Sequence, residues 1–248
     1  MLGIIGGSGL DRMDGLESVR QLSVDTPYGQ PSAALSRGRL NGQELLYLPR
    51  HGADHSIAPH RINYRANLWA LHAHGVSAVV AVAAVGGIAV TLEPGSLVVP
   101  TQLIDYTHGR EATYFDGIAN PLKHIDFTQP FSAVIRGKLL RAGVVAGVHL
   151  RDGGTYAATQ GPRLETAAEI DRLARDGADI VGMTGMPEAV LARELGMDYA
   201  MLAVVVNAAA GRGNNVHGVS IVEIDAVAAM AMDKVLRILA KLEAIDGD

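Results

Sequence analysis

Two short segments carry residue types that can bind a small anion. Small residues at positions 6–9 (GGSG) would let backbone amides approach an anion, and the Ser8 hydroxyl adds a donor. Arg50 offers a planar fork of donors suited to phosphate oxygens, and His51 and His55 add imidazoles beside it. A plain tight turn explains the first segment more simply, and a solvated basic loop explains the second equally well.

Two further segments have related chemistry. The small residues at 83–87 (AAVGG) would leave backbone N–H groups open to a ligand, although close packing explains them equally well. In the segment at 183–188, Met183 could pack on a sugar face, Thr184 could donate to phosphate, and Glu188 could hold ribose hydroxyls. A methionine is more often part of the core than a ligand contact. No single segment is decisive.

All four segments follow or interrupt a regular pattern of strands and helices. The apolar runs predict strands at 2–5, 44–48, 78–85, 96–100, 179–183 and 199–206, and the helical spacing predicts helices at 63–74, 166–176, 187–195 and 225–243. Unbroken apolar strands separated by helices indicate a sheet covered on both faces, so we expect one α/β domain over 1–248. Ligands of such sheets gather at the carboxyl ends of strands. The polar and aromatic segment 102–131 is predicted to be a functional loop.

The composition of the chain argues against several classes of function. The 248 residues have a formal net charge of -5, which argues against nucleic acid as a partner. The chain has no cysteine, which excludes disulfides and thiolate metal sites, and its histidines lack the spacing of a metal motif. The N-terminus lacks a signal-peptide pattern, and no apolar run is long enough to span a membrane. We therefore expect a cytoplasmic protein with no membrane partner, no metal and no organic cofactor.

Read in order, longer motifs resemble the nucleoside phosphorylase superfamily, specifically its trimeric branch that contains methylthioadenosine phosphorylase. The matching segments are GIIGGSGL at 3–10, DTPYGQPS at 25–32, RHG-x-x-H at 50–55, INYRANLWAL at 62–71, QGPRLETAAE at 160–169 and GMTGMPEAVLARELG at 182–196. Together they span nearly the whole chain. The resemblance implies a three-layer α/β/α fold with a mixed central sheet, and a homotrimer with shared active sites. It also implies two small-molecule substrates, a nucleoside and inorganic phosphate.

The resemblance also implies roles for individual residues. Phosphate would be held by Ser8, Arg50, His51, Thr184 and the backbone N–H of Ala84, with His55 among the substrate-binding residues. Relatives often carry a threonine or asparagine where Ala83 stands, so one donor is absent here. Met183 would lie beneath the ribose, and the base near Leu164, where relatives usually carry phenylalanine. His124 would reach across a subunit interface toward the neighbour's 5′ group.

Two departures from methylthioadenosine phosphorylases bear on the base. Asn207 and Ala209 stand where those enzymes carry two aspartates, and Glu165 stands where they typically carry a serine. An amide can donate to a 6-oxo oxygen while accepting from protonated N7, and a carboxylate can accept from the N1–H that a 6-oxopurine has and adenine lacks. We therefore expect the substrate to be a 6-oxopurine nucleoside, specifically 5′-methylthioinosine. The alternative is that these residues changed by drift in a site that still binds the adenosine-type base.

The expected reaction is attack of phosphate at C1′ through a transition state with oxocarbenium character. Phosphate fixed by Arg50 and His51 would be the nucleophile, and Asn207 would stabilise the leaving purine. Four alternatives remain open: a methylthioadenosine phosphorylase, a general 6-oxopurine nucleoside phosphorylase, a nucleosidase that uses water, and a non-catalytic nucleoside-binding protein.

Overall fold

The protein is built around one mixed sheet. The computed structural model describes residues 1–8, 10, 13 and 15–242. The strand order is β2-β3-β4-β1-β5-β10-β9-β7, and on its other side β5 pairs with β11, which continues to β6 and β8. The strands are β1 Leu2–Gly6, β2 Glu17–Leu22, β3 Leu35–Leu40, β4 Gln43–Pro49, β5 Ala78–Gly87, β6 Leu97–Val99, β7 Gln102–Asp105, β8 Arg151–Asp152, β9 Thr155–Ala158, β10 Ile180–Gly182 and β11 Asp198–Ala208.

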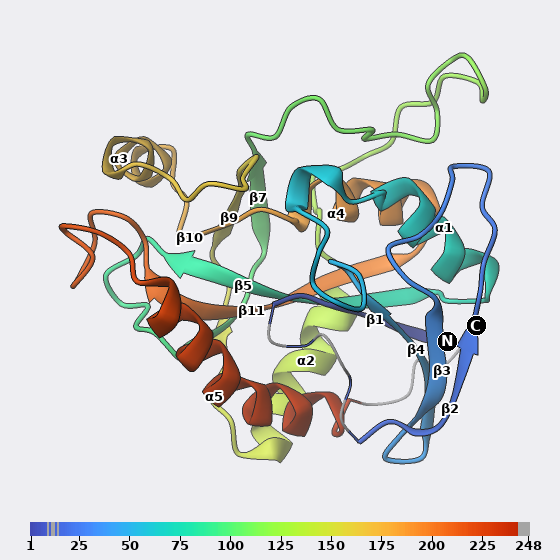
Figure 1. Ribbon diagram of the computed structural model, residues 1–248, viewed down its shortest axis with the longest axis horizontal. Helices are drawn as coiled ribbons and strands as arrows, with labels where there is room; N and C mark the ends of the chain where they lie inside the picture. The colour runs from blue at the N-terminus through green and yellow to red at the C-terminus, as the bar shows by residue number, and fades with distance from the viewer. Residues whose placement is uncertain (9, 11–12, 14, 243–248) are drawn as a thin grey trace.

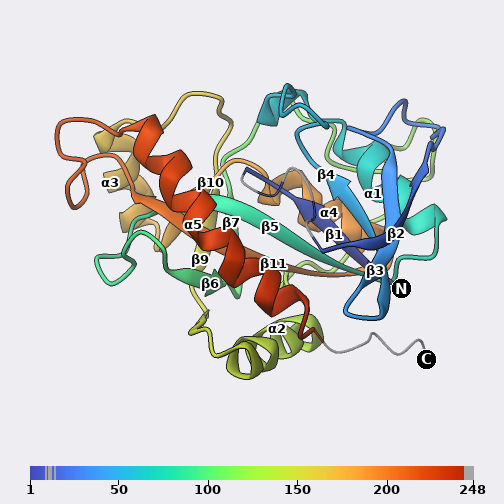
Figure 2. The ribbon, with the colours of Figure 1, turned by 60° about the horizontal axis from the view of Figure 1, so that its bottom comes forward.

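Helices cover both faces of this sheet, as Figures 1 and 2 show. They are η1 Pro59–Arg61, α1 Tyr64–Ala73, α2 Ala133–Ala146, α3 Ala167–Arg175, α4 Gly185–Glu194 and α5 Ile221–Leu239. α1 and α4 pack on one face, and α2 and α5 pack on the other. Successive residues of β5 point to opposite faces, so Val79 belongs to the core under α1 and α4, and Val80 to the core under α2 and α5. The predicted three-layer α/β/α arrangement is therefore confirmed.

One edge of β5 is only partly paired with other strands, and the site lies at the unpaired stretch. β1 pairs with residues 78–81 of β5, and β10 pairs with Gly86 and Gly87. Both must lie on the same side of β5, because β11 pairs along the whole of the other side. Among the described residues, 82–85 therefore have no strand partner on the β1 side. A gap opens there at the carboxyl end of β1, where ligands of α/β sheets gather.

The predicted elements are all present, with shifted ends. The last helix begins at Ile221 rather than at 225, because Ser220 accepts a hydrogen bond from the backbone N–H of Glu223 and caps it there. It ends at Leu239, and the predicted end at 243 lies outside the described residues. Within the predicted loop 102–131, the first four residues form β7, and 106–131 contain no helix or strand. The sequence patterns did not predict β2, β3, β7, β8, β9 and α2.

Candidate functional site

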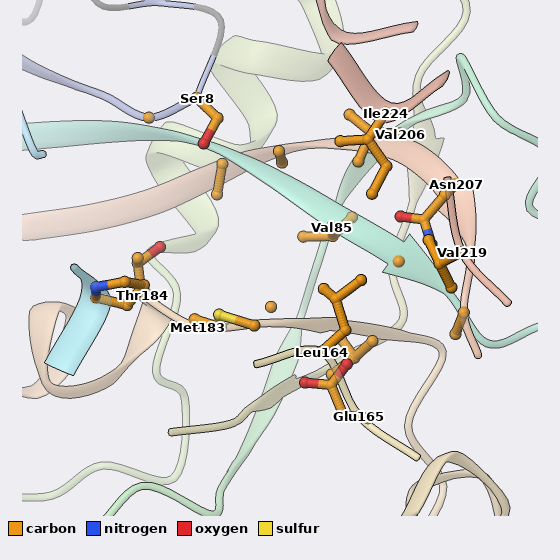
Figure 3. Close-up of a pocket in the computed structure, with 18 of the residues that line it drawn as sticks. Ser8, Val85, Leu164, Glu165, Met183, Thr184, Val206, Asn207, Val219 and Ile224 are labelled. Carbon is orange, nitrogen blue, oxygen red and sulfur yellow. The ribbon is translucent and has the colours of Figure 1, made fainter. Parts of the chain in front are cut away.

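The gap beside β5 is a cavity lined by segments from six parts of the chain. In Figure 3, Ser8 and Thr184 lie at one end, Asn207 at the other, and Met183 between them. Of the predicted site residues, the cavity is lined by Ser8, Arg50, His51, Ala84, Leu164, Glu165, Met183, Thr184 and Asn207. His55 and His124 are not among its lining residues.

The turn after β1 consists of glycines because there is no room for a side chain. A Cβ on Gly6 would collide with the backbone oxygen of Leu10. A Cβ on Gly7 would lie 2.7 Å from Nη1 of Arg50 and 2.8 Å from the carbonyl oxygen of Val82. Neither glycine has a positive φ, so space rather than backbone conformation requires them. The turn thereby brings Ser8 to the cavity; Gly9, the last residue of the predicted segment, lies outside the described residues.

Arg50 reaches the cavity as half of a buried ion pair. Its Nε and Nη2 donate to the two carboxylate oxygens of Glu188 at 2.7 and 2.9 Å, and both side chains are fully buried. The Tyr199 hydroxyl also donates to Glu188, at 2.8 Å. Burial disfavours the arginine's charge, but Glu188 offsets this and raises the pKa of Arg50. The prediction that Glu188 holds ribose hydroxyls is wrong, because both of its oxygens are used inside the protein.

A hydrogen bond of Arg50 shows which backbone groups of β5 face the cavity. Its Nη1 donates to the carbonyl oxygen of Val82 at 2.9 Å. Backbone groups alternate between the two sides of a strand, so the N–H of Ala84 points to the same side as the Val82 carbonyl. No strand pairs with Ala84 on that side among the described residues. This N–H is therefore placed to donate to a ligand.

Two histidines lie beside Ser8. Nδ1 of His51 lies 2.8 Å from the carbonyl oxygen of Ile57, which can only accept, so Nδ1 carries a proton and donates it to this carbonyl. The rings of His51 and His55 stack with centroids 4.6 Å apart, and Nε2 of His55 lies 3.4 Å from the Ser8 hydroxyl oxygen. His51 lines the cavity directly, whereas His55 contacts it through Ser8 and His51.

Thr184 stands where β10 turns into α4. Its side chain does not cap the helix, and it lines the cavity with 6% of its surface exposed. The hydroxyl of Tyr156 accepts from the backbone N–H groups of Thr184 and Gly185, at 3.1 and 3.2 Å. Burial raises the pKa of Tyr156, so the hydroxyl stays protonated. Tyr156 thus fixes the backbone from which the Thr184 side chain projects.

Arg110 is a residue of this region that the sequence did not reveal. Its guanidinium lies within hydrogen-bond distance of six oxygen atoms, namely the carbonyls of Thr159, Gln160, Met183 and Met186, the Gln160 side chain and the Tyr64 hydroxyl, at 2.6–3.2 Å. It thereby joins the segment before α3 to the segment before α4, and both line the cavity. Its position in the predicted functional loop 102–131 was the only available signal.

At the far end, Asn207 is the second-last residue of β11, beside an irregularity in the β5–β11 register. Its Nδ2 donates to the carbonyl oxygen of Ala208 at 2.6 Å, and the Asn215 side chain donates to the same oxygen. Figure 3 shows the Asn207 oxygen directed toward the cavity. The amide therefore presents an acceptor, and Val206, Val219 and Ile224 form apolar walls around it that the sequence did not predict as site residues.

Glu165 lines the same cavity, on the segment that precedes α3. Thr159 donates from its hydroxyl to Oε1 of Glu165 at 2.6 Å. Next to it, Leu164 is 37% exposed and projects into the cavity. Two polar groups, an amide and a carboxylate, thus face one apolar space. This is the pattern of a pocket that orients a planar heterocycle by a few hydrogen bonds.

His124 lies apart from this cavity. It is exposed, on the loop between β7 and α2. Ile118 and Leu122 of the same loop are 93% and 69% exposed. Within the described ranges, no helix is long and apolar enough to cross a membrane, and no group of three or more histidines and carboxylates is arranged to hold a metal ion.

The chain is similar to known phosphorylases over nearly its whole length. Residues 1–242 match the model of the phosphorylase superfamily. A protein of Pseudomonas syringae pv. tomato, described as a probable S-methyl-5′-thioinosine phosphorylase, is 49% identical over 96% of both chains. The 6-oxopurine nucleoside phosphorylase of Pyrococcus furiosus is 45% identical over 85% of this chain and 80% of its own. A methylthioadenosine phosphorylase from Schistosoma mansoni, solved with adenine, superposes with a TM-score of 0.91 at 32% identity, over 97% of this chain and 90% of its own. The chain therefore belongs to the phosphorylase superfamily.

Proposed function

We propose that this chain catalyses phosphorolysis of 5′-methylthioinosine to hypoxanthine and 5-methylthioribose 1-phosphate. A phosphate oxygen forms a bond to C1′ while the bond from C1′ to N9 breaks, and the purine leaves with the electron pair. The purine gains a proton at N7, which is balanced by the proton that hydrogen phosphate loses as it becomes the sugar phosphate. One observation carries the proposal: Asn207 and Glu165 line the same cavity as Ser8 and Thr184. A single nucleoside could lie along it, with the base at one end and the reacting carbon near the other.

The end with Ser8 is assigned to phosphate. Ser8 and Thr184 supply hydroxyls, His51 an imidazole, and Ala84 a backbone N–H that no strand uses among the described residues. Arg50 lies behind this end of the cavity as a lining residue, with its side chain fully buried and its charge balanced by Glu188. These donors would hold the phosphate below the sugar, and the negative charge of the phosphate would stabilise the cation that develops at C1′. His55 supports this end through Ser8 and His51.

Met183 would lie beneath the ribose and Leu164 beside the base. Asn207 presents its oxygen to the cavity, which suits acceptance of a hydrogen bond from N7–H as the purine leaves. The Glu165 carboxylate would accept from N1–H, which a 6-oxopurine has and a 6-aminopurine lacks. A base with the wrong hydrogen-bonding pattern leaves these polar groups without a partner. The free-energy cost of this is far greater than that of a missing methylene.

The 5′ substituent is inferred from the relatives. The Pseudomonas syringae relative is described as acting on the methylthio nucleoside, at 49% identity. The Pyrococcus furiosus relative is described as a 6-oxopurine nucleoside phosphorylase, so that activity is the second candidate. Both candidates place the same oxo group at C6 and use the same base end of the cavity.

We also propose that the enzyme is a homotrimer in the cytoplasm, without metal or organic cofactor. His124 does not line its own chain's cavity. Its loop exposes Ile118 and Leu122, apolar side chains that a neighbouring subunit would cover. These features support a role of His124 at the 5′ group of a neighbour's nucleoside.

An absorbance assay separates these functions. We would supply methylthioinosine, methylthioadenosine and inosine, each with and without phosphate. The proposal expects methylthioinosine to give the highest kcat/KM, and only with phosphate. Equal consumption without phosphate would indicate a nucleosidase, faster consumption of methylthioadenosine would indicate an adenosine-type enzyme, and no turnover would indicate a binding protein. Each of these three results refutes the proposal.

A further inference from the structure

Glu165 lies on the border between two depressions of the surface. On one side it lines the cavity described above. On the other it lines a second depression with Tyr106, His108, Arg163 and Arg172. Arg163 there is already paired with Glu169, and Arg172 lies 3.7 Å from a carboxylate oxygen of Asp176, but both positive charges still attract a further carboxylate. Something must hold Glu165 on the cavity side if it is to contact a base.

Thr159 supplies this restraint. Its hydroxyl oxygen lies 2.6 Å from Oε1 of Glu165 and 3.3 Å from the carbonyl oxygen of Gly182. A hydroxyl has one proton, and the shorter distance shows that Thr159 donates it to Glu165. The Glu165 carboxylate accepts this hydrogen bond, which fixes the direction in which it points. The bond also uses Oε1, so Oε2 is the oxygen that is left for a ligand.

The backbone of Thr159 is itself held on both sides. Its N–H donates to the carbonyl of Gly182 at 2.8 Å, and its carbonyl accepts from Arg110 at 3.2 Å. Arg110 also donates to the carbonyl of Gln160 at 2.9 Å. The hydroxyl therefore projects from a fixed point between the segments that precede α3 and α4.

We propose that Thr159 is a specificity-determining residue, which positions the Glu165 carboxylate so that it accepts from N1–H of a 6-oxopurine. This inference rests on the proposed function. Without the hydroxyl, Glu165 can turn toward Arg163 and Arg172 in the second depression. The cavity then lacks an acceptor for N1–H, which weakens the preference for the 6-oxo base.

The test compares three variants by the ratio of kcat/KM for methylthioinosine to kcat/KM for methylthioadenosine. Thr159→Val keeps the shape and removes the hydroxyl, and we expect the ratio to fall by roughly ten- to a hundredfold, as for a lost hydrogen bond to a charged group. Thr159→Ser restores the donor and should return the ratio to near the wild-type value. Thr113→Val is the matched control, because Thr113 donates to Glu194 at 2.7 Å away from the cavity, and it should leave the ratio unchanged.

The outcomes separate this inference from the function it rests on. A wild-type protein that prefers methylthioadenosine refutes the proposed function. A wild-type preference for methylthioinosine that survives in Thr159→Val refutes the role of Thr159. An equal fall in Thr113→Val, or no recovery in Thr159→Ser, also refutes it, because the effect would then come from packing rather than from the donated hydrogen bond. Thermal melts of each variant confirm that folded proteins are compared.

Discussion

The buried pair of Arg50 and Glu188 allows a quantitative test of how the site is built. Replacing Glu188 with glutamine removes the negative charge but keeps the shape. The guanidinium then remains fully buried without its counter-charge, and the glutamine amide presents N–H groups to a partner that only donates. Tyr199 also loses its charged acceptor. We expect a large loss of stability.

The magnitude follows from the geometry. Glu188 accepts three hydrogen bonds, at 2.7, 2.9 and 2.8 Å, with no exposed surface. Removing one partner of such a buried pair costs about 3–5 kcal/mol, a large share of the roughly 5–15 kcal/mol that stabilises a folded domain. The exposed pair of Arg37 and Glu44 has a similar distance, 2.9 Å, but side chains 41% and 47% exposed. Glu44→Gln should therefore cost no more than about 1 kcal/mol.

Urea unfolding at pH 7 measures both losses, with and without phosphate. Phosphate should restore part of the stability of Glu188→Gln, because an anion compensates the guanidinium that Glu188 no longer balances, and a ligand that binds only the folded state stabilises it. The double variant Arg50→Met, Glu188→Leu removes both charges and should be more stable than Glu188→Gln, yet lose phosphate-dependent activity. A loss in Glu188→Gln no larger than in Glu44→Gln would refute the reasoning.

Three further predictions follow from the site. Gly7→Ala should raise the KM for phosphate and lower stability by about 1–3 kcal/mol, because its Cβ would displace Arg50; an unchanged KM in steady-state kinetics would contradict this. Asn207→Asp should slow turnover of the 6-oxopurine nucleoside, on the order of 10²-fold, and raise that of the 6-amino one. If absorbance assays find the same base preference in that variant, Asn207 does not read the base. Sedimentation equilibrium should give three times the chain mass of 26.0 kDa, and a monomer would refute the shared active site.

The sequence predicted the central strands because they are buried on both faces. β5 is a nearly continuous run of alanine and valine, and β11 is apolar from Tyr199 to Val206, as is typical of a sheet covered on both faces. β2 could not be found in this way, because five of its six residues are exposed and its composition resembles that of a loop. β9 is only four residues long, and α2 contains Gly137 and Gly143, which weaken the helical pattern.

Residues at strand ends were predictable as site candidates, whereas those that hold them were not. Ser8, Thr184 and Asn207 each follow an apolar run, so their meeting at one edge of a sheet could be expected. Four of the six oxygen atoms that Arg110 contacts are backbone carbonyls of distant segments, and every residue has such a carbonyl, so the sequence does not mark them. The pairing of Arg50 with Glu188 was missed for a similar reason, since 138 positions separate them.

The gap beside β5 exists only when its neighbours are in place, and they come from both ends of the chain. β1 begins at Leu2, β10 at Ile180 and β11 at Asp198, and the apolar wall extends to Ile224. A nascent chain still lacking its last strand would therefore have no place for either substrate. Nucleoside binding would therefore measure whether folding is complete. Among ribosome-bound fragments of increasing length, nucleoside binding should appear abruptly rather than rise in proportion to length.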